Sequence, residues 1–254
     1  MTDNLRSRLD RRITSYKEVL AAAPPQRSLF TRYPIRERIP YVQLADAVPT
    51  PISSIDTDHG TLWVKRDDVT STLYGGNKVR KLEFVLAAAL QRNCTPIVVG
   101  ATRSHQVLAS AIFTRLLGMD CEAVLFPQPP STETDVVSAV LDSFDIPVHL
   151  ASNPYQSPLT IARALMATDK ARGRKCLIYP GSSSPAGILG YVDCGLEIVD
   201  AIHGGDLPKP DVVYTALGTG GTAVGLAIGL ALGGVDSRVC AVRVAEPAVS
   251  NRWH

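Results

Sequence analysis

The chain has 254 residues, of which 45% are hydrophobic and 20% are charged, so it has the composition of an ordinary globular protein with one or two domains. A net charge of +2 without a basic run argues against nucleic acid as a partner. No segment resembles a signal peptide or a membrane span. The five dispersed cysteines are expected to be reduced thiols of a cytoplasmic protein, and neither they nor the histidines have metal-ligand spacing.

The first part of the chain predicts a helix, a connector and a short strand. Residues 3–22 carry apolar residues at the helical period, which predicts an amphipathic helix. A proline-rich connector follows, and "TLWVKRDD" at 61–68 includes a short strand.

From residue 96 onward, short apolar strands alternate with longer helices. This alternation is typical of parallel sheets covered by helices on both faces, so the predicted fold class is α/β. Strands are expected near 96–101, 121–126, 147–151, 175–180, 211–217 and 238–246, and helices near 104–118, 132–144, 158–173, 190–202 and 222–234.

A glycine-rich loop joins the strand at 211–217 to the helix that follows it. Backbone N–H groups of such a loop converge at a helix N-terminus, which favours a phosphate as the ligand. A tight turn without a ligand is the structural alternative. The loop consists of Gly218, Thr219, Gly220, Gly221 and Thr222.

Two kinds of phosphate compound fit this loop. Gly218 to Ala223 satisfies the dinucleotide pattern G-x-G-x-x-A, and Glu246 ends the next strand, where a ribose-binding acid would lie. The loop comes late in the chain, however, and its threonine hydroxyls suit a terminal phosphate better. The dinucleotide interpretation also leaves the cations of "LYGGNKVRKLEF", residues 73–84, unexplained.

That second segment places a pair of glycines directly before Asn77 and Lys78 and adds Arg80 and Lys81 within one helical turn. A solvated helix N-terminus is one interpretation. In the other, the loop binds the phosphate of pyridoxal phosphate, and Lys78 supplies the amine that reacts with its aldehyde. Lys81 lies on the same helical face and can then reach the phosphate.

These segments resemble the 1-aminocyclopropane-1-carboxylate (ACC) deaminase / D-cysteine desulfhydrase family of fold-type II, tryptophan synthase β-like, pyridoxal phosphate enzymes. The resemblance covers about residues 45–245 and is carried by "GGNKVRKLE", "GATRSHQ", "GSSSPAGILGY" and "ALGTGGT". It implies two open, mainly parallel twisted sheets, with a large domain formed by 1–75 and 180–254 and a small α/β domain formed by 76–179. Since the family continues beyond the strand that ends this chain, we expect the chain to be incomplete at its C-terminus.

The resemblance also implies roles for individual residues. Lys78 and Ser104 are the implied catalytic residues, and Ser104, His105 and Gln106 are the implied substrate contacts. His105 departs from the family's usual asparagine, which hydrogen-bonds the phenolic oxygen of the cofactor, whereas Gln106 matches the carboxylate-binding position of the deaminases. The implied cofactor contacts are Asn77, Lys78, Lys81, His105, Gly218, Thr219, Gly220, Gly221 and Thr222.

The resemblance favours a homodimeric lyase or deaminase that acts on a small amino acid and releases ammonia and a 2-oxo acid. The residue that faces the pyridine nitrogen in this family would lie beyond the last residue, so biosynthetic β-replacement and racemisation stay open. A nicotinamide-binding oxidoreductase and a non-catalytic pyridoxal phosphate-binding protein are the alternatives from other classes.

Overall fold

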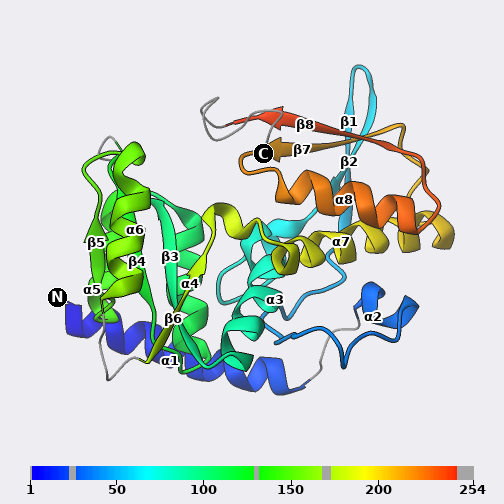
Figure 1. Ribbon diagram of the computed structural model, residues 1–254. Coiled ribbons are helices and arrows are strands. Elements are labelled where there is room, and N and C mark those ends of the chain that lie inside the picture. The colour runs from blue at the N-terminus through cyan, green and yellow to red at the C-terminus, as the bar shows by residue number, and fades with distance from the viewer. Residues whose placement is uncertain (1, 23–26, 129–131, 168–172, 245–254) are drawn as a thin grey trace.

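The computed structural model describes residues 2–22, 27–128, 132–167 and 173–244 (Figure 1). These residues form a four-stranded sheet on one side, and on the other a pair of parallel strands and an antiparallel hairpin beside two long helices. Within the described ranges, no helix is long and apolar enough to cross a membrane.

The four-stranded sheet is entirely parallel and has the order β5-β4-β3-β6. Its central strand β3 is buried along its whole length, which explains its unbroken apolar run. Alternate residues face opposite layers: Ile97 and Val99 pack under α6, whereas Val98 faces α1, α4 and α5. The strands are β3 (Cys94–Ala101), β4 (Glu122–Phe126), β5 (Val148–Leu150) and β6 (Arg174–Ile178), and the helices are α1 (Thr2–Ala22), α4 (His105–Leu116), α5 (Thr132–Ser143) and α6 (Ser157–Met166).

The other side of the molecule is built on two long helices that pack against each other. Tyr191 and Cys194 of α7 meet Leu226 and Leu230 of α8 in a separate hydrophobic cluster. The two parallel strands and the hairpin lie beside this pair in Figure 1. The elements are α7 (Pro185–Gly204), α8 (Gly221–Leu232), β7 (Val212–Leu217) and β8 (Arg238–Arg243), with the hairpin strands β1 (Ile52–Thr57) and β2 (Gly60–Lys65).

Helix α3 (Asn77–Gln91) lies between the two sides and contacts α4 as well as α7. It follows a short 3₁₀ turn, Asp67–Val69, that comes directly after the hairpin. Helix α2 (Ser28–Arg32) packs on α7. The helix α1, which we had assigned to the large domain, contacts α4 and α5, and the domain division stays a prediction.

The predicted α/β class with mainly parallel sheets is confirmed, and the differences are local. The hairpin is antiparallel, and α2 interrupts the proline-rich connector. Helix α6 ends at Met166, and residues 168–172 of its predicted extension lie outside the described part. Helix α7 begins at Pro185, earlier than predicted, because Ser184 caps it by accepting from the Gly187 N–H and proline suits the first helical turn.

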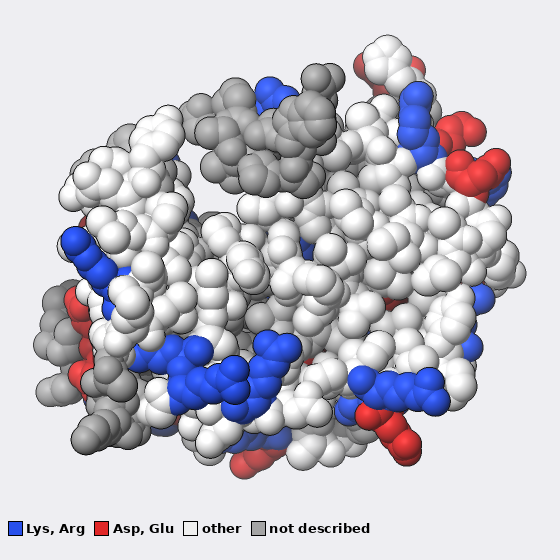
Figure 2. Space-filling model, viewed as in Figure 1, with Lys and Arg blue, Asp and Glu red and all other residues white. Residues whose placement is uncertain are grey.

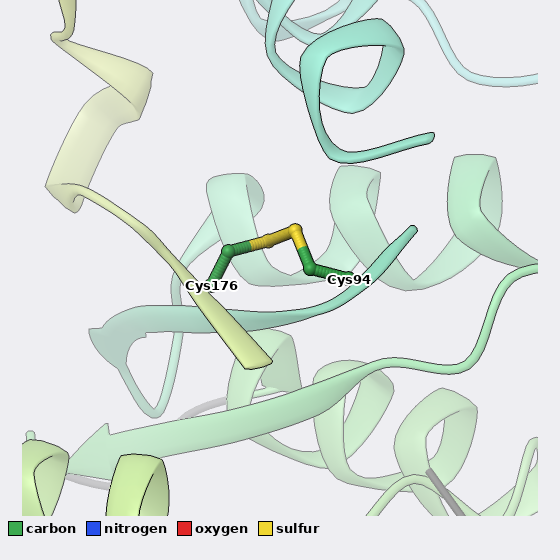
Figure 3. The surroundings of a disulfide bond; sticks show 2 residues. All are labelled: Cys94 and Cys176. Atoms are coloured by element: carbon green, nitrogen blue, oxygen red, sulfur yellow. A yellow bond between two sulfur atoms is a disulfide. The ribbon is translucent and has the colours of Figure 1, made fainter. Parts of the chain in front are cut away.

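The expectation that all five cysteines are reduced is wrong for one pair. Cys94 at the start of β3 and Cys176 on the neighbouring β6 form a disulfide, with their Cα atoms 5.8 Å apart (Figure 3). These residues are 82 positions apart in sequence, and only the pairing of two strands brings them together. The other three cysteines, Cys121, Cys194 and Cys240, are in the thiol form.

We therefore expect three cysteines to react with an alkylating reagent in denaturant without reductant, and five after reduction, as counted by mass spectrometry. Cys176→Ser should lower the free energy of unfolding by about 2–4 kcal/mol, because it removes a long-range crosslink. Cys240→Ser, at a half-buried free thiol, is the matched control. Five reactive thiols before reduction would contradict the disulfide.

Candidate functional site

The two glycines before Asn77 are required by the turn that begins α3. A Cβ atom on Gly75 would lie 1.9 Å from the Asp68 carbonyl oxygen, and Gly76 has a φ of +108°. The Gly76 N–H donates to the Asp67 carbonyl oxygen (2.9 Å), and its own carbonyl accepts from the Thr70 hydroxyl (3.1 Å). Only glycine fits such a close and left-handed backbone, so the turn fixes where Asn77 and the rest of α3 begin.

The cations of α3 are not a solvated helix N-terminus. Arg80 is 0% exposed and Lys81 is 2% exposed, and Lys78 is partly buried. Figure 2 instead shows a group of exposed Lys and Arg side chains near the lower end of the four-stranded sheet. A buried cation requires either carboxylate partners or a lowered pKa, because unpaired buried charge is strongly unfavourable.

Arg80 has these partners on the side of α3 that faces α7. Its guanidinium donates to both carboxylate oxygens of Glu197 (2.6 and 2.9 Å) and to Asp67 (2.9 Å). Lys65 also pairs with Glu197 (2.6 Å). Burial alone would raise the pKa of Glu197, but Arg80 and Lys65 together hold it at about 2, so the carboxylate stays charged.

A second buried arginine extends this cluster to the connector. Arg27 pairs with Glu83 of α3 and with Asp193 of α7, the latter at 3.0 Å. Glu83 also accepts from the backbone N–H groups of Leu44 (3.0 Å) and Ala45 (3.1 Å). The two arginines therefore tie one face of α3 to α7 and to the chain before the hairpin.

Lys81 faces the other way and has a different environment. Its ammonium donates to the Gly181 carbonyl oxygen (3.2 Å), and among the described residues it forms no ion pair with a carboxylate. Burial, and then repulsion from the neighbouring Lys78, lower the pKa of Lys81 to about 7. Burial also lowers the pKa of Lys78. The structure thus brings the two predicted lysines together in a site where the described residues supply no countercharge.

The predicted glycine loop closes on Lys81. A Cβ atom on Gly221 would lie 3.3 Å from the Lys81 Nζ atom and 2.5 Å from the Ser183 hydroxyl. Thr219 shares a hydrogen bond of 2.6 Å with Ser183. Gly220 precedes α8 with a φ of +84°, and no side chain caps that helix N-terminus. The first N–H groups of α8 are therefore presented beside an ammonium group and two hydroxyls.

The other two loop residues have less crowded surroundings. Gly218 has open space where a Cβ atom would lie, and Thr222 is partly buried in the first turn of α8. Sequence reasoning missed Ser183 as a site residue, although "GSSSPAGILGY" was part of the resemblance. The run of small hydroxyl residues after a parallel strand was the signal that could have found it.

The predicted substrate contacts lie at the N-terminus of α4. Ser104 is its N-cap and accepts from the Val107 N–H. The exposed His105 shares a hydrogen bond between its Nδ1 atom and the Tyr74 hydroxyl (2.7 Å). Gln106 is buried, and its amide nitrogen donates to Ser182 (2.7 Å), which joins α4 to the turn that holds Lys81.

This donor set fits a phosphate dianion. The lysines, the uncapped helix N-terminus and the hydroxyls of Ser183 and Thr219 are donors, and the glycine at position 221 leaves room against Lys81. In the described ranges, no group of three His, Cys, Asp or Glu residues could hold a metal ion.

Comparisons with known proteins point to the same chemistry. The family model described as pyridoxal-phosphate dependent enzyme matches residues 45–254. A putative ACC deaminase of Pyrococcus abyssi is 30% identical over 88% of this chain and 66% of its own length. A D-cysteine desulfhydrase of Yersinia pestis is 36% identical over 75% of this chain and 59% of its own length. The chain therefore spans about three fifths to two thirds of these relatives.

Solved structures share the fold. The crystal structure of an ACC deaminase homologue matches with a TM-score of 0.72 and 27% identity, over 87% of this chain and 67% of that one. A hydrogen sulfide-producing enzyme from Fusobacterium nucleatum matches with a TM-score of 0.57 and 23% identity, over 76% of this chain and 57% of that one. The match of the family model over most of the sequence, together with these relatives, identifies the chain as a member of the pyridoxal-phosphate dependent enzyme family.

Proposed function

We propose that this protein binds pyridoxal phosphate and acts as a lyase of the deaminase or desulfhydrase type on a small amino acid, releasing ammonia and a 2-oxo acid. The observation that carries the proposal is the pair of desolvated lysines, Lys78 and Lys81, of which Lys81 lies against the glycine loop and pairs with no carboxylate among the described residues. The names of the relatives, ACC deaminase and D-cysteine desulfhydrase, support this type of reaction.

Lys81 and the loop would hold the phosphate. The N-terminus of α8 offers backbone donors at Gly221 and Thr222, and Thr219 and Ser183 offer hydroxyls. Lys81 balances the phosphate charge, and binding of that anion returns its pKa upward from about 7. The family favours pyridoxal phosphate over a nicotinamide dinucleotide as the ligand of this loop. Glu246, which the dinucleotide interpretation required, lies outside the described residues.

Lys78 would provide the reactive amine and move the substrate proton. When bound, pyridoxal phosphate supplies an aldehyde for amines and a ring that withdraws electrons. Because burial lowers the pKa of Lys78, a larger fraction of its side chain is the neutral amine, which is the form that attacks an aldehyde or accepts a proton. Asn77, the first residue of α3, directly precedes Lys78 and would contact the cofactor from the helix start.

Ser104 and His105 would act from the N-terminus of α4. The Ser104 oxygen accepts the Val107 N–H, so its own proton is available for a substrate group. Tyr74 engages the Nδ1 atom of His105, which leaves Nε2 as the nitrogen that can face the phenolic oxygen of the cofactor. Neither side chain pairs with a carboxylate among the described residues.

Gln106 would bind the substrate carboxylate after rotation of its amide. Its nitrogen donates to Ser110 and Ser182, whereas its buried oxygen has no hydrogen-bond partner among the described residues. Both serine hydroxyls can donate as well as accept, so rotating the amide by half a turn keeps both bonds. The rotation would present the NH₂ group on the side where the oxygen now lacks a partner.

We also propose a homodimer in the cytoplasm. Large apolar side chains of the two-stranded parallel sheet are exposed, including Tyr214 (65%) and Val242 (51%), together with Trp63 of the hairpin (40%). Apolar area of this kind on a sheet supports burial against another subunit.

Sulfate binding to the cofactor-free protein should weaken as the pH rises through about 7. Sulfate keeps two negative charges over this range, whereas Lys81, with its pKa of about 7, changes from charged to neutral. Isothermal titration calorimetry on either side of that pH measures the effect. Lys81→Met should remove the pH dependence and Lys81→Arg should bind sulfate at both pH values; an unchanged dependence in Lys81→Met would contradict this assignment.

Borohydride reduction of the protein loaded with pyridoxal phosphate should attach the cofactor to Lys78, as peptide mass spectrometry detects. Lys78→Ala should lose both this label and the visible absorption of the bound cofactor. Lys209→Ala, which removes an exposed lysine that pairs with Asp236 on the surface, is the matched control. A label on another lysine would refute the role of Lys78.

A screen of small D- and L-amino acids, with D-cysteine and ACC included, should find a substrate that yields ammonia and a 2-oxo acid. Both products are measured in wild type, Lys78→Ala and Ser104→Ala, and activity should be lost in the first and reduced about 10²-fold or more in the second. Inversion of an amino acid without products, or consumption of an added thiol, would point to racemisation or β-replacement instead of a lyase.

A further inference from the structure

Tyr191 links the phosphate side of α3 to its charge-paired side. Its ring centroid lies 5.6 Å from the Lys81 Nζ atom, and its hydroxyl donates to the Asp67 carboxylate at 2.8 Å. Asp67 in turn pairs with Arg80. Tyr191 is 4% exposed, so both contacts are made away from water.

The backbone of α8 holds this ring against α3. A Cβ atom on Gly225 would lie 2.5 Å from the Tyr191 Cβ atom, so α8 packs directly on the root of the side chain. The Tyr191 side chain is therefore held at its Cβ atom by the packing of α8 on α7 and at its hydroxyl by Asp67, and its ring lies beside the Lys81 ammonium. None of the residues predicted from the sequence supplies this contact.

We propose that Tyr191 is a positioning residue that holds the ammonium group of Lys81 at the glycine loop for a phosphate, with its ring as the cation's neighbour and its hydroxyl as the anchor. The proposal rests on the proposed function, because it concerns the phosphate part of the same site. Tyr191 acts through Lys81 and need not touch the ligand.

The choice of an aromatic ring over a carboxylate follows from the charge that a phosphate requires. A carboxylate beside Lys81 would neutralise the ammonium group and repel the incoming dianion. The negative face of an aromatic ring stabilises a desolvated cation by an electrostatic contact but adds no net charge. Lys81 has such a ring and no carboxylate partner among the described residues, which leaves its charge for the ligand.

Binding of pyridoxine 5′-phosphate, an analogue without the aldehyde, tests the contact by calorimetry. Tyr191→Leu should weaken binding about 2- to 30-fold, the range expected for loss of a cation–π contact. Tyr191→Phe keeps the ring and should retain most of the affinity. In a Lys81→Met background, Tyr191→Leu should cause no further loss, because the two residues act through one contact.

An equal loss from Tyr191→Leu in the presence and absence of Lys81 would overturn the proposal, as would a Tyr191→Phe variant as weak as Tyr191→Leu. Thermal unfolding of each variant checks that it is folded.

A second measurement needs no ligand and follows the pH dependence of Lys81 labelling by an amine reagent. The profile should shift to lower pH in Tyr191→Leu, because the ring no longer stabilises the ammonium form. An unchanged profile also overturns the proposal. Failure of the wild type to bind the analogue would refute the proposed function, while the labelling still decides the ring contact.

Discussion

The structure depends on the pairing of Arg80 inside the protein. A fully buried guanidinium is tolerated only where carboxylates neutralise its charge and accept hydrogen bonds from its N–H groups. For Arg80, these carboxylates are Glu197 and Asp67. Removing one member of such a cluster typically costs about 3–5 kcal/mol, because the remaining charge stays buried without a partner. This requirement sets the rotation of α3 about its axis. With Arg80 paired in this way, the Lys81 ammonium lies at the glycine loop.

The second consequence is electrostatic. The buried carboxylates of Glu83 and Glu197 form ion pairs with Arg27, Arg80 and Lys65. Among the described residues, no carboxylate pairs with Lys81. Two neighbouring ammonium groups then share a site of low polarity beside an uncapped helix N-terminus. Such a site is unfavourable when empty and strongly favours a dianion. The proposed binding of an anion follows from this distribution of charges around one helix.

The sequence predicted what local patterns determine. The alternation of strands and helices predicted the α/β class, and glycines beside Lys78 and after β7 predicted the two halves of the site. It could not predict the partners of Arg80, which lie up to 117 positions away. Ser183, Tyr191 and the Cys94–Cys176 bond depend in the same way on how distant strands and helices pack, and the cysteine prediction was wrong for that reason.

A crystal structure of the protein grown with pyridoxal phosphate tests the central claim most directly, since it places both ends of the cofactor at once. The account predicts the phosphate between the Lys81 ammonium and the backbone of Gly221, with the aldehyde carbon bonded to Lys78 and Arg80 still paired with Glu197. A phosphate bound away from the glycine loop, or a cofactor beyond reach of Lys78, would contradict it.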